Sequence, residues 1–86
     1  MSSDQKSVKV SVLFFGATAD AVGEREIEIN FPEKTKAGEA FREILARFPS
    51  LENHKLLFAV NQEYAKGDET ICDGDELAVF TAVSGG

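Results

Sequence analysis

The amino-acid sequence predicts an α+β fold, in which one main helix packs against one face of a mixed sheet. Two patterns in the sequence support this prediction. Apolar and polar residues alternate along residues 24–31 and along most of residues 8–15, as they do in half-buried strands, and residues 76–82 are predicted to form the last strand. Between residues 35 and 48 the apolar residues recur at helical spacing instead. A chain of 86 residues has room for one modest core, so we expect these elements to share it.

Composition narrows the class of protein further. Contents of 43% apolar and 28% charged residues are ordinary for a soluble globular protein. The sequence has no apolar run long enough to span a membrane and no basic-then-apolar leader, so we expect a cytoplasmic protein with no membrane partner. The net charge of −6 argues against a nucleic-acid partner and favours a basic groove on a protein partner. A single cysteine, Cys72, excludes an internal disulfide and a cysteine metal cluster.

The first predicted strand covers residues 8–15. Residues 1–7 before it are polar, and we expect them to be a disordered lead-in. One face of the strand is predicted to enter the core, through Val8, Val10, Val12 and Phe14. The other face begins polar but ends in Leu13 and Phe15, so this end of the outer face is apolar.

A second strand is predicted at residues 24–31, after a loop at residues 16–23. Its apolar positions alternate with Glu26, Glu28 and Asn30, and they are Ile27, Ile29 and Phe31. The glutamates at 24, 26 and 28 are expected to form a solvated strand face. The two strands are most simply a hairpin with a long loop, and Pro32 ends it.

The main helix is expected to begin after Thr35, a plausible N-cap. Its apolar stripe consists of Ala37, Phe41, Ile44, Leu45 and Phe48. Pro49 is expected to stop the helix at Phe48. This stripe predicts a helix with one face packed on the sheet.

The rest of the chain supplies further strands and turns. Residues 56–60 are apolar throughout and fit a strand beside the helix or at the centre of the sheet. Residues 61–66 are polar and fit a short strand or turn, and Asp73-Gly74-Asp75 is a strong turn signal. If the first strand and the last, at 76–82, are parallel neighbours, the domain at residues 8–82 is a ubiquitin-like β-grasp.

The last strand runs almost directly into a tail of small residues, Val83-Ser84-Gly85-Gly86. Glycine has no Cβ, so such a tail can fit where a larger side chain would clash. An extended tail at residues 83–86 is therefore small enough to pass a narrow channel.

Four stretches together resemble the small, sulfur-carrying subunits of molybdopterin synthase, in the MoaD/ThiS family of ubiquitin-like proteins. They match that family in order and spacing. The stretches are Val10-Ser11-Val12-Leu13-Phe14-Phe15-Gly16 with Ala21-Val22-Gly23, then Phe58-Ala59-Val60-Asn61-Gln62-Glu63, then Asp73-Gly74-Asp75-Glu76-Leu77-Ala78, and finally Val83-Ser84-Gly85-Gly86.

The resemblance implies that residues 83–86 are a reactive C-terminal tail, inserted into a partner. A ubiquitin-activating-type adenylyltransferase (MoeB-like) would use Mg-ATP to adenylate the Gly86 carboxylate. Sulfur from a persulfide donor would displace AMP and leave a thiocarboxylate. The tail would then enter the large subunit of molybdopterin synthase (MoaE-like), which carries the catalytic side chains, and would donate sulfur to the dithiolene of molybdopterin. The implied assembly has two copies of each subunit, and this chain binds no permanent cofactor or metal.

Two pairs of residues depart from the family pattern. Thr81 and Ala82 stand where the family usually has Pro-Pro, so the tail is expected to be less pre-extended. Ala19 and Asp20 stand where the first loop often carries an Arg-Glu pair, so one polar contact with a partner is expected to be missing or replaced.

An aromatic docking face is expected on the sheet. Alternation puts Phe15 and Phe80 opposite the valine-rich faces of strands that should be neighbours, and the resemblance adds Tyr64. An exposed aromatic cluster of this kind is typical of an interface. The alternative is that the segment at residues 16–23 covers these side chains.

Three other features have ordinary structural interpretations. Cys72 is expected to be a small, part-buried filler, and His54 a surface residue without metal-ligand partners. The carboxylates of Asp73, Asp75 and Glu76 could suggest a cation site but are more typical of a tight turn.

Three alternatives to the molybdopterin function stay open. The chain could carry sulfur for thiamine thiazole synthesis. It could be a ubiquitin-like protein modifier, joined through Gly86 to a lysine, because the same adenylation serves both outcomes. It could also be a plain binding domain in which the Gly-Gly pair is incidental.

Overall fold

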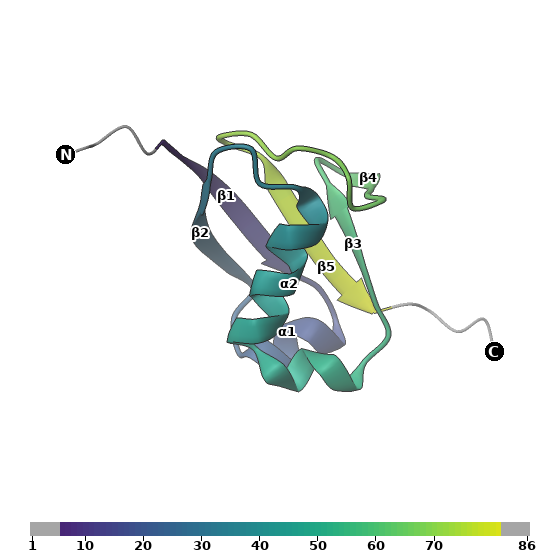
Figure 1. Ribbon diagram of the computed structural model, residues 1–86. Coiled ribbons are helices and arrows are strands. Elements are labelled where there is room, and N and C mark those ends of the chain that lie inside the picture. Colours follow the sequence, from purple (N-terminus) through teal and green to yellow (C-terminus); the bar gives the residue numbers. More distant parts are fainter. Residues whose placement is uncertain (1–5, 82–86) are drawn as a thin grey trace.

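The computed structural model describes residues 6–81 and contains a five-stranded mixed sheet with the order β2-β1-β5-β3-β4 (Figure 1). β1 and β5 run parallel at its centre, whereas the other neighbouring pairs are antiparallel. The strands are β1 (Ser7–Phe14), β2 (Glu26–Pro32), β3 (Leu56–Val60), β4 (Glu63–Tyr64) and β5 (Glu76–Thr81). The parallel contact of first and last strands confirms the predicted β-grasp.

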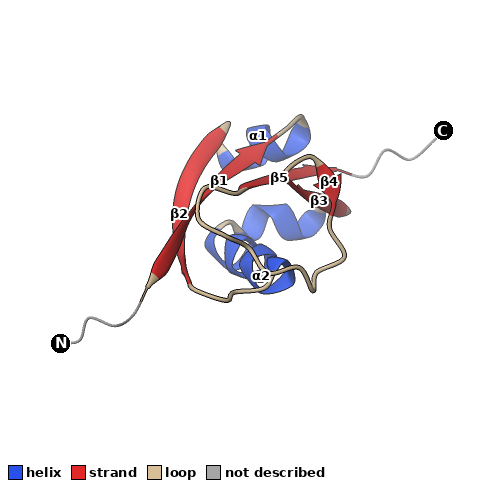
Figure 2. Cartoon of the chain, turned by 90° about the horizontal axis from the view of Figure 1, so that it is seen from above, coloured by secondary structure: helices blue, strands red, loops and turns tan. Residues whose placement is uncertain are grey.

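One main helix, α2 (Ala37–Arg47), packs on one face of this sheet, as Figure 2 shows from above. A 3-10 helix, η1 (Pro49–Asn53), follows α2 and was not predicted. Phe48 caps the end of α2, which confirms Pro49 as the stop signal. None of the helices within residues 6–81 is long and apolar enough to cross a membrane.

The core lies between α2 and the sheet, and it uses the predicted faces. The valine-rich face of β1 is buried, as are Leu77 and Val79 of β5. From the helix, Ala37, Ala40 and Ile44 are buried, and the larger residues of the predicted stripe pack around them. Because the alternation and the helical spacing point to the same side, the sequence predicts this core correctly.

Residues 16–23, expected to be a loop, contain a short helix instead, α1 (Ala17–Val22). Gly16 and Gly23 flank it with φ of 60° and 85°, and the N–H of Gly23 caps it by donating to the carbonyl of Ala19. A helix of 6 residues is too short to show a clear apolar period, which explains why sequence alone missed it. The burial of Thr18, contacted by β5, indicates that tertiary contacts stabilise this turn.

The predicted N-cap at Thr35 is wrong by one residue. The cap is Lys36, whose backbone N–H donates to Glu39 Oε1 at 2.9 Å. The Thr35 hydroxyl donates instead to the carbonyl of Pro32 at 2.6 Å. An isolated bridge between Lys36 and Thr70 keeps the chain extended at this point, so the helix begins one residue later than its sequence signal.

Candidate functional site

The face of the sheet opposite α2 carries an aromatic cluster, which we call the aromatic face and define as Phe15, Tyr64 and Phe80 with Leu57; Phe80 is half-buried and the other three are exposed. Phe15, Leu57 and Tyr64 are 52%, 40% and 74% exposed, which is unusual for large apolar or aromatic side chains. The rings of Tyr64 and Phe80 lie 5.9 Å apart, centroid to centroid. The structure therefore brings together the three aromatic residues that the sequence analysis selected.

Strand pairing explains why residues so distant in sequence meet here. Leu57 of β3 lies opposite Phe80 of β5, and Ala59 lies opposite both Ala78 and Tyr64. The small side chains Ala59 and Ala78 leave a shallow hollow, which Phe15, Tyr64, Phe80 and Gln62 surround. A surface with small residues at its centre and aromatic residues around them suits insertion of a partner's side chain.

Thr18 holds one edge of the aromatic face in place. Its side chain is fully buried, and its Oγ1 lies 2.7 Å from the carbonyl oxygen of Phe15 and 3.0 Å from that of Val79. The N–H of Phe15 also donates to the Val79 carbonyl, at 3.1 Å. Phe15 is thus anchored through its backbone while its ring faces solvent, so segment 16–23 supports this ring and does not cover it.

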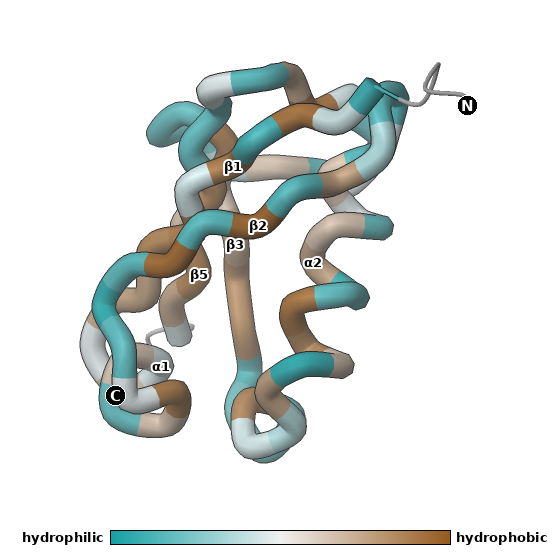
Figure 3. The backbone as a smooth tube through the Cα atoms, turned by 90° about the vertical axis from the view of Figure 1, so that its left-hand side faces the viewer, coloured by the Kyte–Doolittle hydropathy of each residue, from teal (hydrophilic) through white to brown (hydrophobic). Residues whose placement is uncertain are grey.

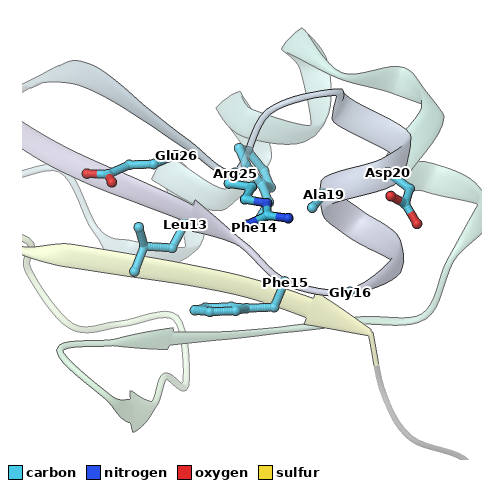
Figure 4. A pocket seen from close by; sticks show the side chains of 8 residues that line it. All are labelled: Leu13, Phe14, Phe15, Gly16, Ala19, Asp20, Arg25 and Glu26. Atoms are coloured by element: carbon cyan, nitrogen blue, oxygen red, sulfur yellow. The ribbon is translucent and has the colours of Figure 1, made fainter.

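A second hollow borders Phe15 and has a mixed polar rim (Figure 4). Leu13, Phe15 and Ala19 supply its apolar part, whereas Asp20 and Arg25 supply charges of opposite sign. Ala19 and Asp20 are the positions at which the family often has an Arg-Glu pair. Arg25 therefore offers a positive charge beside the position from which that arginine is missing.

The tail lies just beyond this face in the sequence. β5 ends at Thr81, next to Phe80 of the aromatic face. The predicted tail residues Val83, Ser84, Gly85 and Gly86 lie outside the described residues, as does Ala82, so their role stays a prediction. The structure does describe the strand that precedes the tail, β5, which is central in the sheet and paired on both sides, with β1 and β3.

Comparison with known proteins identifies the family. Residues 12–86 match the ThiS family. The chain belongs to that family. It is 40% identical over 83 residues to the molybdopterin synthase sulfur carrier subunit of Caenorhabditis elegans, covering 92% of this chain and 99% of that one. It is 39% identical over 83 residues to the human protein of the same name, covering 91% and 94%.

Solved structures of similar fold agree with the ThiS-family assignment. A Pyrococcus furiosus protein described as molybdopterin converting factor, subunit 1, is 31% identical, with a TM-score of 0.82 over 90% of this chain and 100% of that one. SAMP1 from Haloferax volcanii is 26% identical, with a TM-score of 0.79 over 91% and 99% of the two chains. Both confirm the β-grasp fold.

The remaining candidates in this ThiS-family chain have structural roles. Asp73 Oδ1 accepts the N–H of Lys9 at 2.8 Å, and Asp75 accepts from the N–H of Cys72 and from Asn61 Nδ2. These bonds confirm the turn interpretation, and within residues 6–81 no group of side chains is suited to hold a metal ion.

Two predictions about exposure have different outcomes. His54 is exposed, as expected. Cys72, expected to be part-buried, is exposed. The preceding residue, Ile71, takes the buried position, and in an extended segment the next side chain then points away from the core.

Glu69 has a perturbed pKa and was missed by the sequence analysis. Its carboxylate accepts hydrogen bonds from the backbone N–H groups of Lys66 and Gly67, at 2.7 and 2.8 Å. These bonds favour the charged form and lower the pKa of Glu69. Glu69 therefore orders the loop before β5 and is not part of the aromatic face.

Proposed function

We propose that this chain is the sulfur carrier subunit of a molybdopterin synthase and acts in molybdenum cofactor biosynthesis. The observation that carries the proposal is the likeness to proteins of that name over nearly the full length of both chains. These include the Escherichia coli protein, which is 38% identical over 84 residues, covering 90% of this chain and 99% of that one. The family match extends to residue 86, so it includes the Gly-Gly pair.

The proposed chemistry takes place at the Gly86 carboxylate. Adenylation with Mg-ATP by an activating enzyme (MoeB-like) would join this carboxylate to AMP, with release of pyrophosphate. A persulfide sulfur then attacks the acyl carbon and AMP leaves, and reduction of the remaining disulfide by a thiol releases the thiocarboxylate. Val83, Ser84, Gly85 and Gly86 are small enough to enter a narrow channel in the large subunit (MoaE-like).

The aromatic face is the proposed docking surface for these partners. It is exposed, it is anchored by Thr18, and it lies at the strand that leads into the tail. Aromatic side chains on a rigid surface lose little conformational entropy on binding, which makes them effective interface anchors. Docking here would determine where the tail begins relative to the partner's active site.

The test is the intact mass of the chain after incubation with the activating enzyme, ATP and a persulfide donor. The expected result is a mass gain equal to replacement of one oxygen by sulfur, located at Gly86. A variant that lacks Gly86 is the control, and it should keep the fold but neither gain this mass nor support molybdopterin formation with the large subunit. Molybdopterin formation by the shortened chain would overturn the proposal.

A ubiquitin-like modifier is the second candidate, favoured by the likeness to SAMP1 from Haloferax volcanii, whose name is small archaeal modifier protein 1. The same incubation, with cell extract added, separates the two functions. Adducts in which Gly86 is joined to a lysine would support a modifier, whereas a thiocarboxylate passed to the large subunit supports the carrier. A thiocarboxylate used only by a thiazole-forming enzyme would identify the thiamine branch of sulfur carriers.

A further inference from the structure

β2 forms a long, open edge of the sheet. Among the described residues its only strand partner is β1, and the opposite edge strand, β4, has just 2 residues. β2 has 7 residues, and Figure 3 shows it crossing the front of the molecule with nothing between it and the viewer. We propose that this edge receives an extended segment of a partner protein as an additional strand, with basic residues at alternate positions.

The backbone of β2 has hydrogen-bonding groups available for this pairing. The N–H of Phe14 donates to the carbonyl of Arg25, and the N–H of Glu33 donates to that of Lys6. Since such bonds alternate along an antiparallel pair, residues 27, 29 and 31 point their backbone groups at β1. Glu26, Glu28 and Asn30 therefore point their N–H and C=O groups outward, as an added strand requires.

Charge decides which kind of segment fits. The side chains of Glu26 and Glu28 are exposed, and their cross-strand neighbours on β1 are Leu13 and Ser11. In residues 6–81 the only salt bridge joins Arg47 and Glu43, so neither strand carboxylate is paired. Each has one empty cross-strand position, on the open side of β2, where a lysine or arginine would be stabilised.

The helix side of the edge is lined mainly by polar residues. A shallow groove runs between β2 and α2, and Asn30, Phe31, Glu39 and Glu43 are among its lining residues. The carboxylates of Glu39 and Glu43 already accept hydrogen bonds, Glu39 from the backbone N–H of Lys36 and Glu43 from the side chain of Arg47. The alternate residues of the added strand would lie over this groove. Because its two glutamates are already engaged, the groove requires no second row of basic residues, and the outer face alone sets the basic alternation.

A second copy of this chain does not fit the edge well. Pairing two β2 strands edge to edge would bring the glutamates of one copy beside those of the other, and like charges in adjacent strands are destabilising. The net charge of −6 also opposes self-association. The proposed occupant is therefore a basic segment of a different protein.

The experiment is a titration of the full-length, 15N-labelled chain with the peptide Lys-Val-Lys-Val-Lys. Binding is monitored through the changes in the amide chemical shifts of the chain. Shifts are expected along residues 24–33, and they should weaken as salt is raised. The Glu26→Gln/Glu28→Gln variant should bind about three- to tenfold more weakly, because two cross-strand charge pairs are lost. The matched control is Glu52→Gln/Glu63→Gln, which changes the charge equally but away from β2.

A second variant tests the backbone. Glu28→Pro removes an outward N–H and leaves the ladder to β1 intact, so it should bind more weakly than Glu28→Gln. If Glu28→Pro does not fold, the comparison of the two double variants still shows whether the glutamates of β2 contribute to peptide binding. Shifts centred on Phe15, Tyr64 and Phe80, self-association through β2, or no binding would each overturn the proposal. The titration does not involve Gly86, so its failure is separate from failure of the carrier function.

Discussion

At the scale of single residues, Thr18 of α1 links this helix by its side-chain hydroxyl to the turn at Phe15 and to β5. Its hydroxyl lies within hydrogen-bond distance of two carbonyl oxygens in a fully buried position. We expect Thr18→Val, which keeps the shape but removes the donor, to lower the free energy of unfolding by about 1–2 kcal/mol. Urea denaturation measures this change.

The control for this prediction is Thr35→Val. The Thr35 hydroxyl also donates to a carbonyl, that of Pro32, but in an exposed position where water can replace it. Its loss should cost no more than about 0.5 kcal/mol. Equal losses of stability in the two variants would show that burial of the Thr18 hydroxyl has no special effect.

The lowered pKa of Glu69 predicts how the free energy of unfolding depends on pH. Its folded-state pKa lies below the ordinary value of 4.5 because its carboxylate accepts two backbone N–H bonds. The carboxylate therefore contributes stability that is fully present above pH 4.5 and is lost as the pH falls through the folded-state pKa. Glu69→Gln should reduce the pH dependence of the free energy of unfolding in this acidic range.

Urea denaturation at a series of acidic pH values would measure that dependence. The matched control is Glu63→Gln, which removes an exposed carboxylate on β4. If both variants lose stability in parallel with the unmodified chain as the pH falls, the hydrogen bonds at Glu69 do not favour its charged form.

At the scale of elements, the first turn of α2 packs against the loop that Glu69 orders. The N–H of Gly38 donates to the carbonyl of Gly67 at 2.9 Å, and a Cβ at residue 38 would lie 3.1 Å from that oxygen. Glu69 holds this loop through the N–H of Gly67, so the loop has little room to move away. The close approach explains a glycine where helix propensity alone would favour alanine.

We therefore expect Gly38→Ala to destabilise the protein, although alanine raises helix propensity by about 1 kcal/mol. Thermal denaturation measures the sign of the change. Ala46→Gly, at an exposed position of the same helix, measures the stability difference between alanine and glycine that comes from helix propensity alone. A higher melting temperature for Gly38→Ala would mean that the loop adjusts easily and that the contact is unimportant.

The elements also show which local signals are reliable. The β1, β2 and α2 predictions were confirmed because each has several residues of one period and a buried face. α1 was missed because its helical turn depends on the contact between Thr18 and β5, which lies 61 residues away in sequence. The Thr35 cap was misplaced because the bridge from Lys36 to Thr70 overrides the local signal.

At the scale of the whole molecule, the aromatic face should carry much of the binding energy for a large subunit. We expect Tyr64→Ala to weaken that complex by about 2 kcal/mol, or about thirtyfold in Kd, since exposed aromatic anchors are typical hot spots. Stability should change little because Tyr64 is 74% exposed. Titration calorimetry with the large subunit measures the affinity.

His54→Ala is the matched control, because His54 is exposed but lies outside the aromatic face. It should leave the Kd unchanged. An unchanged Kd for Tyr64→Ala would show that partners dock on another surface. Thiocarboxylate formation at Gly86, measured on the same variant, would then show whether the activating enzyme binds the aromatic face.

The α+β class, the strand faces, the helix stripe and the family resemblance could all be predicted from the chain alone, because each depends on periodicity or on local motifs. The sequence also selected Phe15, Tyr64 and Phe80 through alternation and resemblance. Three features became visible only in the folded chain: the rings share one face of the sheet, Thr18 anchors that face, and β2 is left as an open edge. These features could not be predicted from local patterns because they depend on strand order and register, which bring together residues far apart in sequence.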